Sequence, residues 1–190
     1  MLACLGILGL GVLGVLAYVF VLYNGVVRLK ILVEEAWSGI DVQLKKRYDL
    51  IPNLVETVKG YAKHEKGTFE KVAELRTRAM GTNDPEELGK IEGELRGTLK
   101  TLFAVAESYP ELKANENFLN LQNTLKEIET EIESARRYYN GAVRDYNMKI
   151  QVFPANMLAG MLGFSVKKFF ETSEGERENV KVSFTDEEAK

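Results

Sequence analysis

The sequence has very few of the residue types that build catalytic and metal centres. Its 190 residues include one cysteine, Cys4, and one histidine, His64. A single cysteine excludes a disulfide within the chain, and we expect Cys4 to be membrane-buried and inert. A di-iron site in a helical bundle needs two Glu-x-x-His motifs, and a zinc-protease helix needs two histidines. The single histidine therefore excludes both kinds of site.

Motifs for nucleophilic catalysis and for phosphate binding are also missing. No GxSxG motif occurs, and the glycines of GLGVLG lie inside an apolar run. The formal net charge of -3 argues against a nucleic-acid-binding face. Four glutamates spaced two residues apart spread around a helix and indicate a solvated face: Glu127, Glu129, Glu131 and Glu133. We predict no catalytic residue, no metal site and no cofactor.

Charge is absent from residues 1–23, which contain no Lys, Arg, Asp or Glu. A helix of this length measures about 35 Å and spans a hydrocarbon core of roughly 30 Å. A cleaved signal peptide would start with cations and end in small residues, whereas this segment starts apolar and ends in AYVFVLY. We expect an uncleaved transmembrane helix rather than a signal peptide or a core helix, with the lipid bilayer as a partner.

The flanks of this segment predict its orientation. Tyr18 and Tyr23 suit the membrane interface, and Arg28 and Lys30 follow directly. The positive-inside rule then predicts a single-pass cell-membrane protein with its N-terminus outside and its C-terminal bundle in the cytoplasm. The oligomeric state is not specified by this pattern.

The remainder of the chain has the apolar spacing of helices. Apolar residues recur every three or four positions across residues 26–150, and no strand pattern competes. Around GTNDPEE, Gly81 is predicted to follow one helix, while Asp84, Pro85 and Glu87 form the cap of the next. The predicted fold is all-α: an N-terminal transmembrane helix, then an antiparallel up-down four-helix bundle over residues 24–152.

Pro52, within KKRYDLIPNL, raises the question of a chain reversal. A proline inside a helix costs about 3 kcal/mol. With Asp49 as an N-cap, Pro52 would lie in a first turn, and Arg47 and its lysine neighbours would close the preceding helix. A single bent helix is the alternative, because the apolar stripe keeps its phase through the proline. We favour reversal and four passes; a bent helix would leave three passes.

The segment 153–170 is rich in Phe, Met and Leu. Four passes would place it beside the bilayer, with Lys167 and Lys168 facing anionic lipid; alternatively it caps the apolar end of the bundle. Its candidate membrane or partner residues are Phe153, Met157, Met161, Phe164, Phe169 and Phe170. Residues 171–190 are acidic, and we expect disorder there. Within them NVKVSF alternates like a strand, which either joins a partner's sheet edge or belongs to an inert tail.

The pairs Tyr139-Asn140 and Tyr146-Asn147 repeat at one heptad and share a helix face. One interpretation is core packing, with the hydroxyls hydrogen-bonded and the asparagines fixing register. The other is a ligand site formed by Glu107, Tyr139 and Tyr146.

Several long motifs identify a family resemblance. They are YNGVVRLK, EEAWSGIDVQLKKRYDLIPNLVETVKGYAKHE, AVAESYPELKANENFLNLQ, ARRYYNGAVRDYN and VFPANMLAG. In this order they closely resemble the LemA family over residues 23–170, with the acidic tail outside. The resemblance implies a prokaryotic membrane protein with a cytosolic four-helix bundle and no established enzymatic activity. It also implies an association with HtpX-type proteases and TPM-domain proteins, and one branch of the family acts in magnetosome membranes.

Two functions are compatible with the sequence. One is a non-catalytic membrane-anchored module that organises a membrane partner or maintains the envelope. The other is a ligand or metal sensor, or an enzyme, with a site of bundle carboxylates and tyrosines.

Overall fold

The computed structural model describes residues 2–62 and 65–171. Within these ranges the chain forms six helices joined by turns and short irregular segments. The helices are α1 (Leu2–Lys59), α2 (Lys66–Met80), α3 (Pro85–Glu107), α4 (Pro110–Lys113), α5 (Glu116–Gln151) and α6 (Ala155–Met161). No strand occurs in the described ranges, so the predicted all-α class is confirmed. His64 and the acidic tail from residue 172, including NVKVSF, lie outside the described residues, as does the side chain of Cys4.

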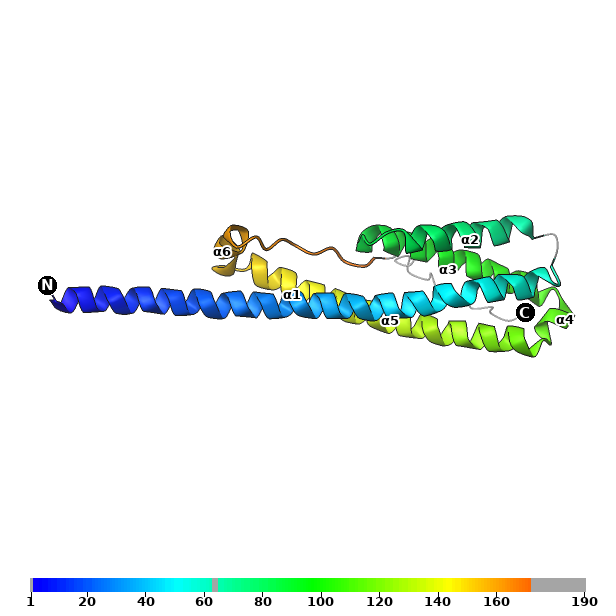
Figure 1. The fold of residues 1–190 in the computed structure, drawn as a ribbon, viewed down its shortest axis with the longest axis horizontal. Helices are drawn as coiled ribbons and strands as arrows, with labels where there is room; N and C mark the ends of the chain where they lie inside the picture. Colours follow the sequence, from blue (N-terminus) through cyan, green and yellow to red (C-terminus); the bar gives the residue numbers. More distant parts are fainter. Residues whose placement is uncertain (1, 63–64, 172–190) are drawn as a thin grey trace, which may run out of the picture.

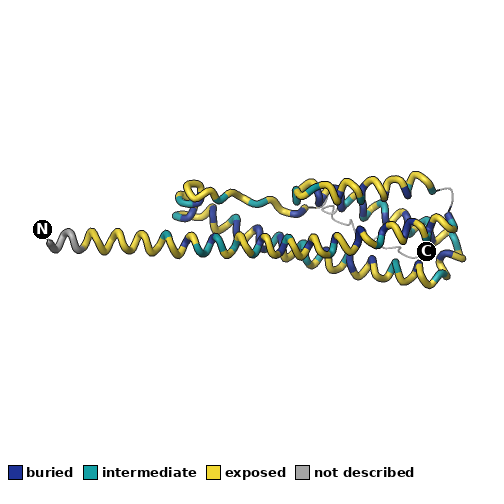
Figure 2. Tube along the Cα trace, in the orientation of Figure 1, coloured by how far each residue is buried: buried dark blue, intermediate teal, exposed yellow. Residues whose placement is uncertain are grey.

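Four long helices run in alternating directions (Figure 1). The second half of α1 lies along α5, and α2 pairs with α3 as a shorter hairpin against them. The N-terminal half of α1 projects beyond the bundle. Its side chains are mostly exposed, whereas buried residues are concentrated where the four helices meet (Figure 2).

Helix α1 continues through Pro52, so the predicted reversal at this proline is wrong. Asp49 is not an N-cap but an interior residue of the helix. Since Pro52 has no N–H, the Tyr48 carbonyl four residues earlier loses its helical donor. Nε of Arg76, from α2, donates a 2.7 Å hydrogen bond to that carbonyl oxygen. Ile51 and Leu54 are buried on either side of the proline, so tertiary packing favours the helical path.

The first reversal lies instead between the end of α1 at Lys59 and the start of α2 at Lys66. Gly60 lowers helix propensity at the point where α1 ends. This reversal divides a segment that the apolar spacing predicts to be one helix. The chain therefore still makes four passes, although α1 is not broken at Pro52.

The boundary between α2 and α3 has a more elaborate cap than the sequence predicts. Asp84 is the N-cap of α3, with its Oδ1 3.0 Å from the N–H of Glu86, and Pro85 begins the helix. Glu87 does not bond to the N-cap N–H as in a capping box. Its carboxylate accepts from the Thr82 hydroxyl at 2.7 Å, and that hydroxyl accepts from the Asp84 N–H. Gly81 has φ −93°, so α2 ends without a left-handed residue.

The core follows the predicted apolar stripes of α1, α2, α3 and α5. Each contributes buried residues at helical spacing, for example Val33, Ile40 and Leu44; Val72 and Leu75; Ile91, Leu95 and Leu102; and Leu125, Ile132 and Val143. Two charged residues, Arg47 and Glu92, are also buried within this core.

Candidate functional site

The N-terminal part of α1 exposes a continuous apolar surface. Nine of its large apolar residues are at least 59% exposed: Ile7, Leu8, Leu10, Val12, Leu13, Val15, Leu16, Phe20 and Val21. In the described part of the chain, α1 is the one helix long and apolar enough to cross a membrane by length and composition. Tyr18 and Tyr23 lie about half exposed along and at the end of this surface, and Arg28 and Lys30 are exposed just beyond it.

A second apolar surface lies beside the end of this segment. We call residues 152–162, which include α6, the foot (Figure 1). Ala155 and Ala159 face the protein and are buried, Leu158 packs partly buried against the core, and the other large apolar side chains point outward. The exposed apolar residues are Val152 (51% exposed), Phe153 (77%), Met157 (66%), Met161 (84%) and Leu162 (41%). The predicted candidates Phe153, Met157 and Met161 therefore share one exposed surface.

The foot is positioned by residues 22–26 of α1 and by the last turn of α5. A Cβ placed on Gly25 would lie 3.8 Å from Cε of Lys149, so the last turn of α5 lies beside Gly25 of α1. The Tyr23 ring packs on Phe164 with centroids 5.8 Å apart. Leu22 and Val26 are buried at the same level. The foot thus lies next to residues 22–26, where the predicted membrane span ends.

After the foot the chain runs back along α5 as an extended segment, residues 164–171, which we call the strap. The two asparagines of the heptad repeat hold it. Nδ2 of Asn147 donates to the Lys167 carbonyl, and its Oδ1 accepts from the Lys167 N–H, both at 2.8 Å. Asn140 bonds Phe170 in the same way, with distances of 3.1 and 2.9 Å.

The two tyrosines bond to strap carbonyls at matching intervals. The Tyr146 hydroxyl donates to Ser165 O at 3.1 Å, and the Tyr139 hydroxyl donates to Lys168 O at 2.9 Å. Seven helical residues rise about 10.5 Å, and three extended residues span about 10 Å. A Tyr-Asn pair every heptad therefore meets the strap backbone every third residue. This periodic match explains the hydroxyl and amide partners of all four side chains.

Phe170 anchors the far end of the strap. It is 1% exposed, and its ring lies 6.0 Å from that of Trp37, which also packs 5.2 Å from Tyr139. The next residue, Glu171, passes so close to α3 that a Cβ on Gly89 would overlap its carbonyl oxygen. Phe169 is 38% exposed, so of these two adjacent phenylalanines the strap presents Phe169 outward and buries Phe170.

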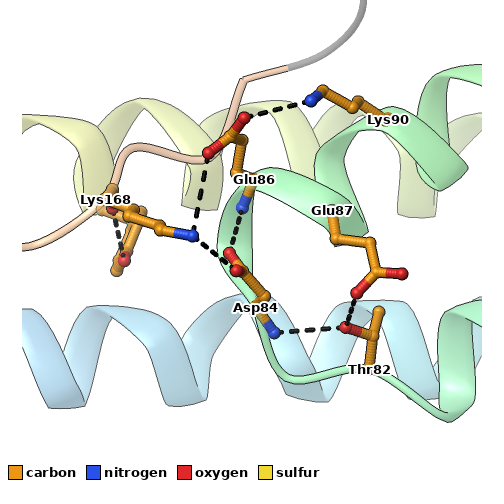
Figure 3. Close-up of polar contacts among 7 residues, drawn as sticks. Thr82, Asp84, Glu86, Glu87, Lys90 and Lys168 are labelled. Atoms are coloured by element: carbon orange, nitrogen blue, oxygen red, sulfur yellow. Dashed lines mark hydrogen bonds and ion pairs between the residues drawn. The ribbon is translucent and has the colours of Figure 1, made fainter.

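Lys168 joins the strap to the start of α3 (Figure 3). Its Nζ lies 2.6 Å from Oδ2 of Asp84 and 3.8 Å from Glu86. The hydrogen bond from Lys168 and the bond from the Glu86 N–H lower the pKa of Asp84, and the Asp84 carboxylate raises the pKa of Lys168. Lys168 is about half exposed, but in this arrangement it faces an N-cap carboxylate rather than the foot surface.

A buried polar network crosses the bundle. The Arg47 guanidinium forms ion pairs with Glu92 and, at 2.8 Å, with Glu129, while the Tyr48 hydroxyl donates to Glu92 at 2.5 Å. Arg96 lies 2.5 Å from the other oxygen of Glu129. Burial lowers the pKa of Arg47 although the Glu129 carboxylate opposes this change, and burial raises the pKa of Tyr48 to about 12. The prediction that Arg47 closes a helix is therefore wrong. Arg47 lies inside α1 and links it to α3 and α5.

The proposed ligand residues are not brought together. Glu107 is the last residue of α3 and is exposed at the end of the bundle near the start of α5. Tyr139 lies 23 residues into α5, about 35 Å along that helix from its first residue. Its hydroxyl and that of Tyr146 already bond to the strap, and burial raises the pKa of Tyr139 to about 12. Among the described residues, no group of three or more His, Cys, Asp or Glu could hold a metal ion.

The buried network could have been predicted from two charged residues that occupy positions of the apolar stripes. Arg47 lies three residues after Leu44 and four before Ile51, so it falls on the apolar stripe of α1. Glu92 likewise lies four residues after Leu88 and three before Leu95. Opposite charges at two stripe positions indicate a buried ion pair. The strap had a weaker signal, because a heptad of Tyr-Asn does not reveal which backbone it binds.

Comparison with known proteins places this fold in a family. The model of the LemA family matches residues 36–184. The family motifs predicted a similarity that ends at Phe170. The match extends to residue 184, so most of the acidic tail lies within the family similarity. Two magnetosome proteins of Paramagnetospirillum magneticum, MamQ 1 and MamQ 2, are each 28% identical over 191 residues, covering 85% of this chain and 70% of the relative. Protein LemA of Metamycoplasma hominis is 29% identical over 155 residues, with coverage of 80% and 69%. None of these names denotes an enzyme, and they indicate a membrane-associated protein. The chain belongs to the LemA family.

Proposed function

We propose that this protein is a non-catalytic membrane-anchored scaffold that contacts the bilayer at two adjacent points and organises a membrane protein partner. The observation that carries the proposal is the position of the foot, whose exposed apolar side chains lie beside the end of the apolar half of α1. A single span leaves a bundle free to tilt. A second apolar contact at the headgroup boundary would hold the bundle upright.

The helix through the membrane supports this role. Because α1 is continuous from Leu2 to Lys59, a movement of the membrane segment is passed to the bundle without a flexible joint. The pairing of α1 with α5 and the aromatic contact between Tyr23 and Phe164 stiffen the junction. Such a unit suits a fixed spacer or adaptor at a membrane surface.

The family associations suggest the class of partner. We propose a membrane protein such as an HtpX-type zinc protease or a TPM-domain protein, bound near the foot. The cations Arg28 and Lys30 beyond the span support a cytoplasmic bundle and an external N-terminus. In a Cys4→Ser background, a cysteine replacing the exposed Met80 should then resist a membrane-impermeant maleimide until the cells are opened.

A photo-crosslinking amino acid at Met157 tests the proposal in intact cells. In the unsubstituted background we expect adducts with lipid and with one membrane protein. The changes Phe153→Ser and Met161→Ser should reduce both kinds of adduct several-fold while leaving the helical content unchanged. The matched control is Met80→Ser with Leu119→Ser, which removes exposed apolar side chains remote from the foot. An adduct pattern that is insensitive to the foot changes would contradict the proposal.

A further inference from the structure

A groove between α3 and α5 has no role in the strap or the foot. It has a volume of about 350 Å³. Leu99 and Phe103 from α3 and Leu125 from α5 supply its apolar surface. Leu99 and Leu125 are buried and form the floor of the groove. Phe103 is half-buried, and the centroid of its ring lies 6.1 Å from that of Phe118.

The strap leads toward this groove. It follows α5 from Asn147 to Asn140, which is the direction of decreasing residue number on α5. At Glu171 it touches α3 at Gly89. Farther along the same direction, the facing residues of the two helices are those that line the groove: Arg96 and Leu99 on α3, and Glu133 and Glu129 on α5. From Gly89 to Leu99 the helix rises about 15 Å.

The chain beyond Glu171 contains a segment that matches the groove in length. Val180, Val182 and Phe184 alternate with polar residues, so an extended chain presents all three on one face. Eight residues, 172–179, precede Val180, and a fully extended chain of that length reaches about 30 Å. That reach exceeds the 15 Å required. The family match includes all of residues 179–184.

The charges of the groove and the tail are complementary. Four cations and two carboxylates line the groove: Arg47, Arg96, Lys100 and Lys126, with Glu129 and Glu133. Arg47 is buried and paired with Glu92 and Glu129, and Arg96 is paired with Glu129 and Glu133, so Lys100 and Lys126 supply the positive charge that faces the tail. The tail segment is flanked on both sides by carboxylates: Glu174, Glu176 and Glu178 before it, and Asp186, Glu187 and Glu188 after it. Opposite net charges favour their association at moderate ionic strength.

We propose that residues 179–184 of the same chain bind in the α3–α5 groove as an extended segment, with Val180, Val182 and Phe184 against Leu99, Phe103 and Leu125. The tail then continues the path of the strap along α3 and α5. A partner that binds this segment as an added strand must first displace it from the groove. This inference concerns a site distinct from the foot, so it stands or falls independently of the scaffold proposal.

Cross-linking of the full-length protein tests the assignment. In a Cys4→Ser background, cysteines replace Lys126 at the groove and Ser183 on the polar face of the segment. A control pair combines Ser183→Cys with Lys71→Cys, which lies on the exposed surface of α2. All of these changes are at surface or tail positions, and a short bis-maleimide reagent is applied to dilute protein in detergent.

We expect the groove pair to cross-link within one chain in at least fivefold higher yield than the control pair. Adding Val182→Ser and Phe184→Ser should reduce that yield to the control level. Equal yields from the two pairs would overturn the proposal. Cross-linked dimers in place of internally linked monomers would also overturn it, because the groove would then be filled by a second copy.

Discussion

Pro52 is an exposed residue of α1, next to the buried Ile51, and its missing N–H leaves the Tyr48 carbonyl without its helical donor. Arg76 replaces that donor from another helix. The interaction therefore does two things at once: it makes the proline tolerable and it joins α2 to α1. A local rule of sequence, that proline ends a helix, fails here because a tertiary contact compensates for the lost backbone bond.

A double-mutant cycle tests this compensation. Arg76→Met in the natural chain should lower the free energy of unfolding by about 1–3 kcal/mol, because a polar carbonyl loses its partner. In a Pro52→Ala background the restored N–H at position 52 can bond to Tyr48, so the same change should cost measurably less. Urea unfolding of the four detergent-solubilised proteins provides the comparison. Equal costs in the two backgrounds would show that Arg76 does not serve the proline.

The Arg47–Glu92 pair predicts a second non-additive result. Arg47→Met alone leaves the Glu92 carboxylate buried without its cation and should destabilise the protein by roughly 3–5 kcal/mol. Arg47→Met with Glu92→Leu should recover most of that loss, since apolar residues of similar size fill the same space. Thermal unfolding of the Arg47→Met, Glu92→Leu and double variants checks the expectation. If the double variant is as unstable as the sum of its single changes, the pair does not act as a buried unit.

The phenol of Tyr139 predicts a pH dependence at high pH. Burial raises its pKa from the ordinary 10.0 to about 12 in the folded protein. The unfolded chain therefore loses this proton first, and the associated stability is complete below pH 10 and is lost as the pH rises toward 12. Tyr139→Phe should make the decline in unfolding free energy between pH 10 and 12 less steep. The exposed neighbour Tyr138 supplies the control variant, Tyr138→Phe. Identical slopes for the two variants would refute the expectation.

At the scale of elements, the strap shows how a helix binds an extended backbone. The matching rise of seven helical and three extended residues lets each asparagine pair with both backbone groups of one strap residue. The core-packing interpretation of the Tyr-Asn repeat predicted hydrogen-bonded hydroxyls, and these are present. Their acceptors, however, lie 19 to 29 residues later in sequence, where no periodic pattern could locate them.

Removing the two asparagines should release the strap without unfolding the bundle. In Asn140→Ala with Asn147→Ala, four hydrogen bonds to the strap are lost, and amide hydrogen exchange over residues 165–170 should accelerate at least tenfold. Exchange in the buried parts of α1 and α3 should stay unchanged. Asn123→Ala, an exposed position on α5, is the matched control. Unaltered protection of the strap in the double variant would mean that the tyrosine hydroxyls, Lys168 and Phe170 hold it without the asparagines.

The helices themselves were the most predictable elements. Stripes such as Ile91–Leu95–Leu102 and the Asp84-Pro85 start of α3 follow from local spacing and capping chemistry. The reversal between Lys59 and Lys66 was not predicted, because the apolar rhythm continues from Val58 to Phe69 across it. Reversals set by loop geometry leave little trace in periodicity when the helices on both sides bury residues at similar phase.

At the scale of the whole molecule, two apolar surfaces lie at one end of an elongated body. The projecting half of α1 and the adjacent foot are both exposed, whereas the bundle buries its stripes (Figure 2). The apolar character of both surfaces was predictable from composition, since residues 1–23 and 153–170 carry few charges. Their adjacency follows from four passes, a number that the sequence predicted with the first reversal wrongly placed at Pro52 and not after Lys59.

Depth measurements in bilayers test the scaffold account most directly. Nitroxide labels at Met157, on the foot, and at Met80, on α2, occupy similarly exposed methionine positions of the same Cys4→Ser protein. The account predicts that the Met157 label is accessible to oxygen and shielded from an aqueous relaxation agent, whereas the Met80 label shows the reverse. If the Met157 label is as open to the aqueous agent as the Met80 label, the foot does not enter the membrane boundary and the central claim is contradicted.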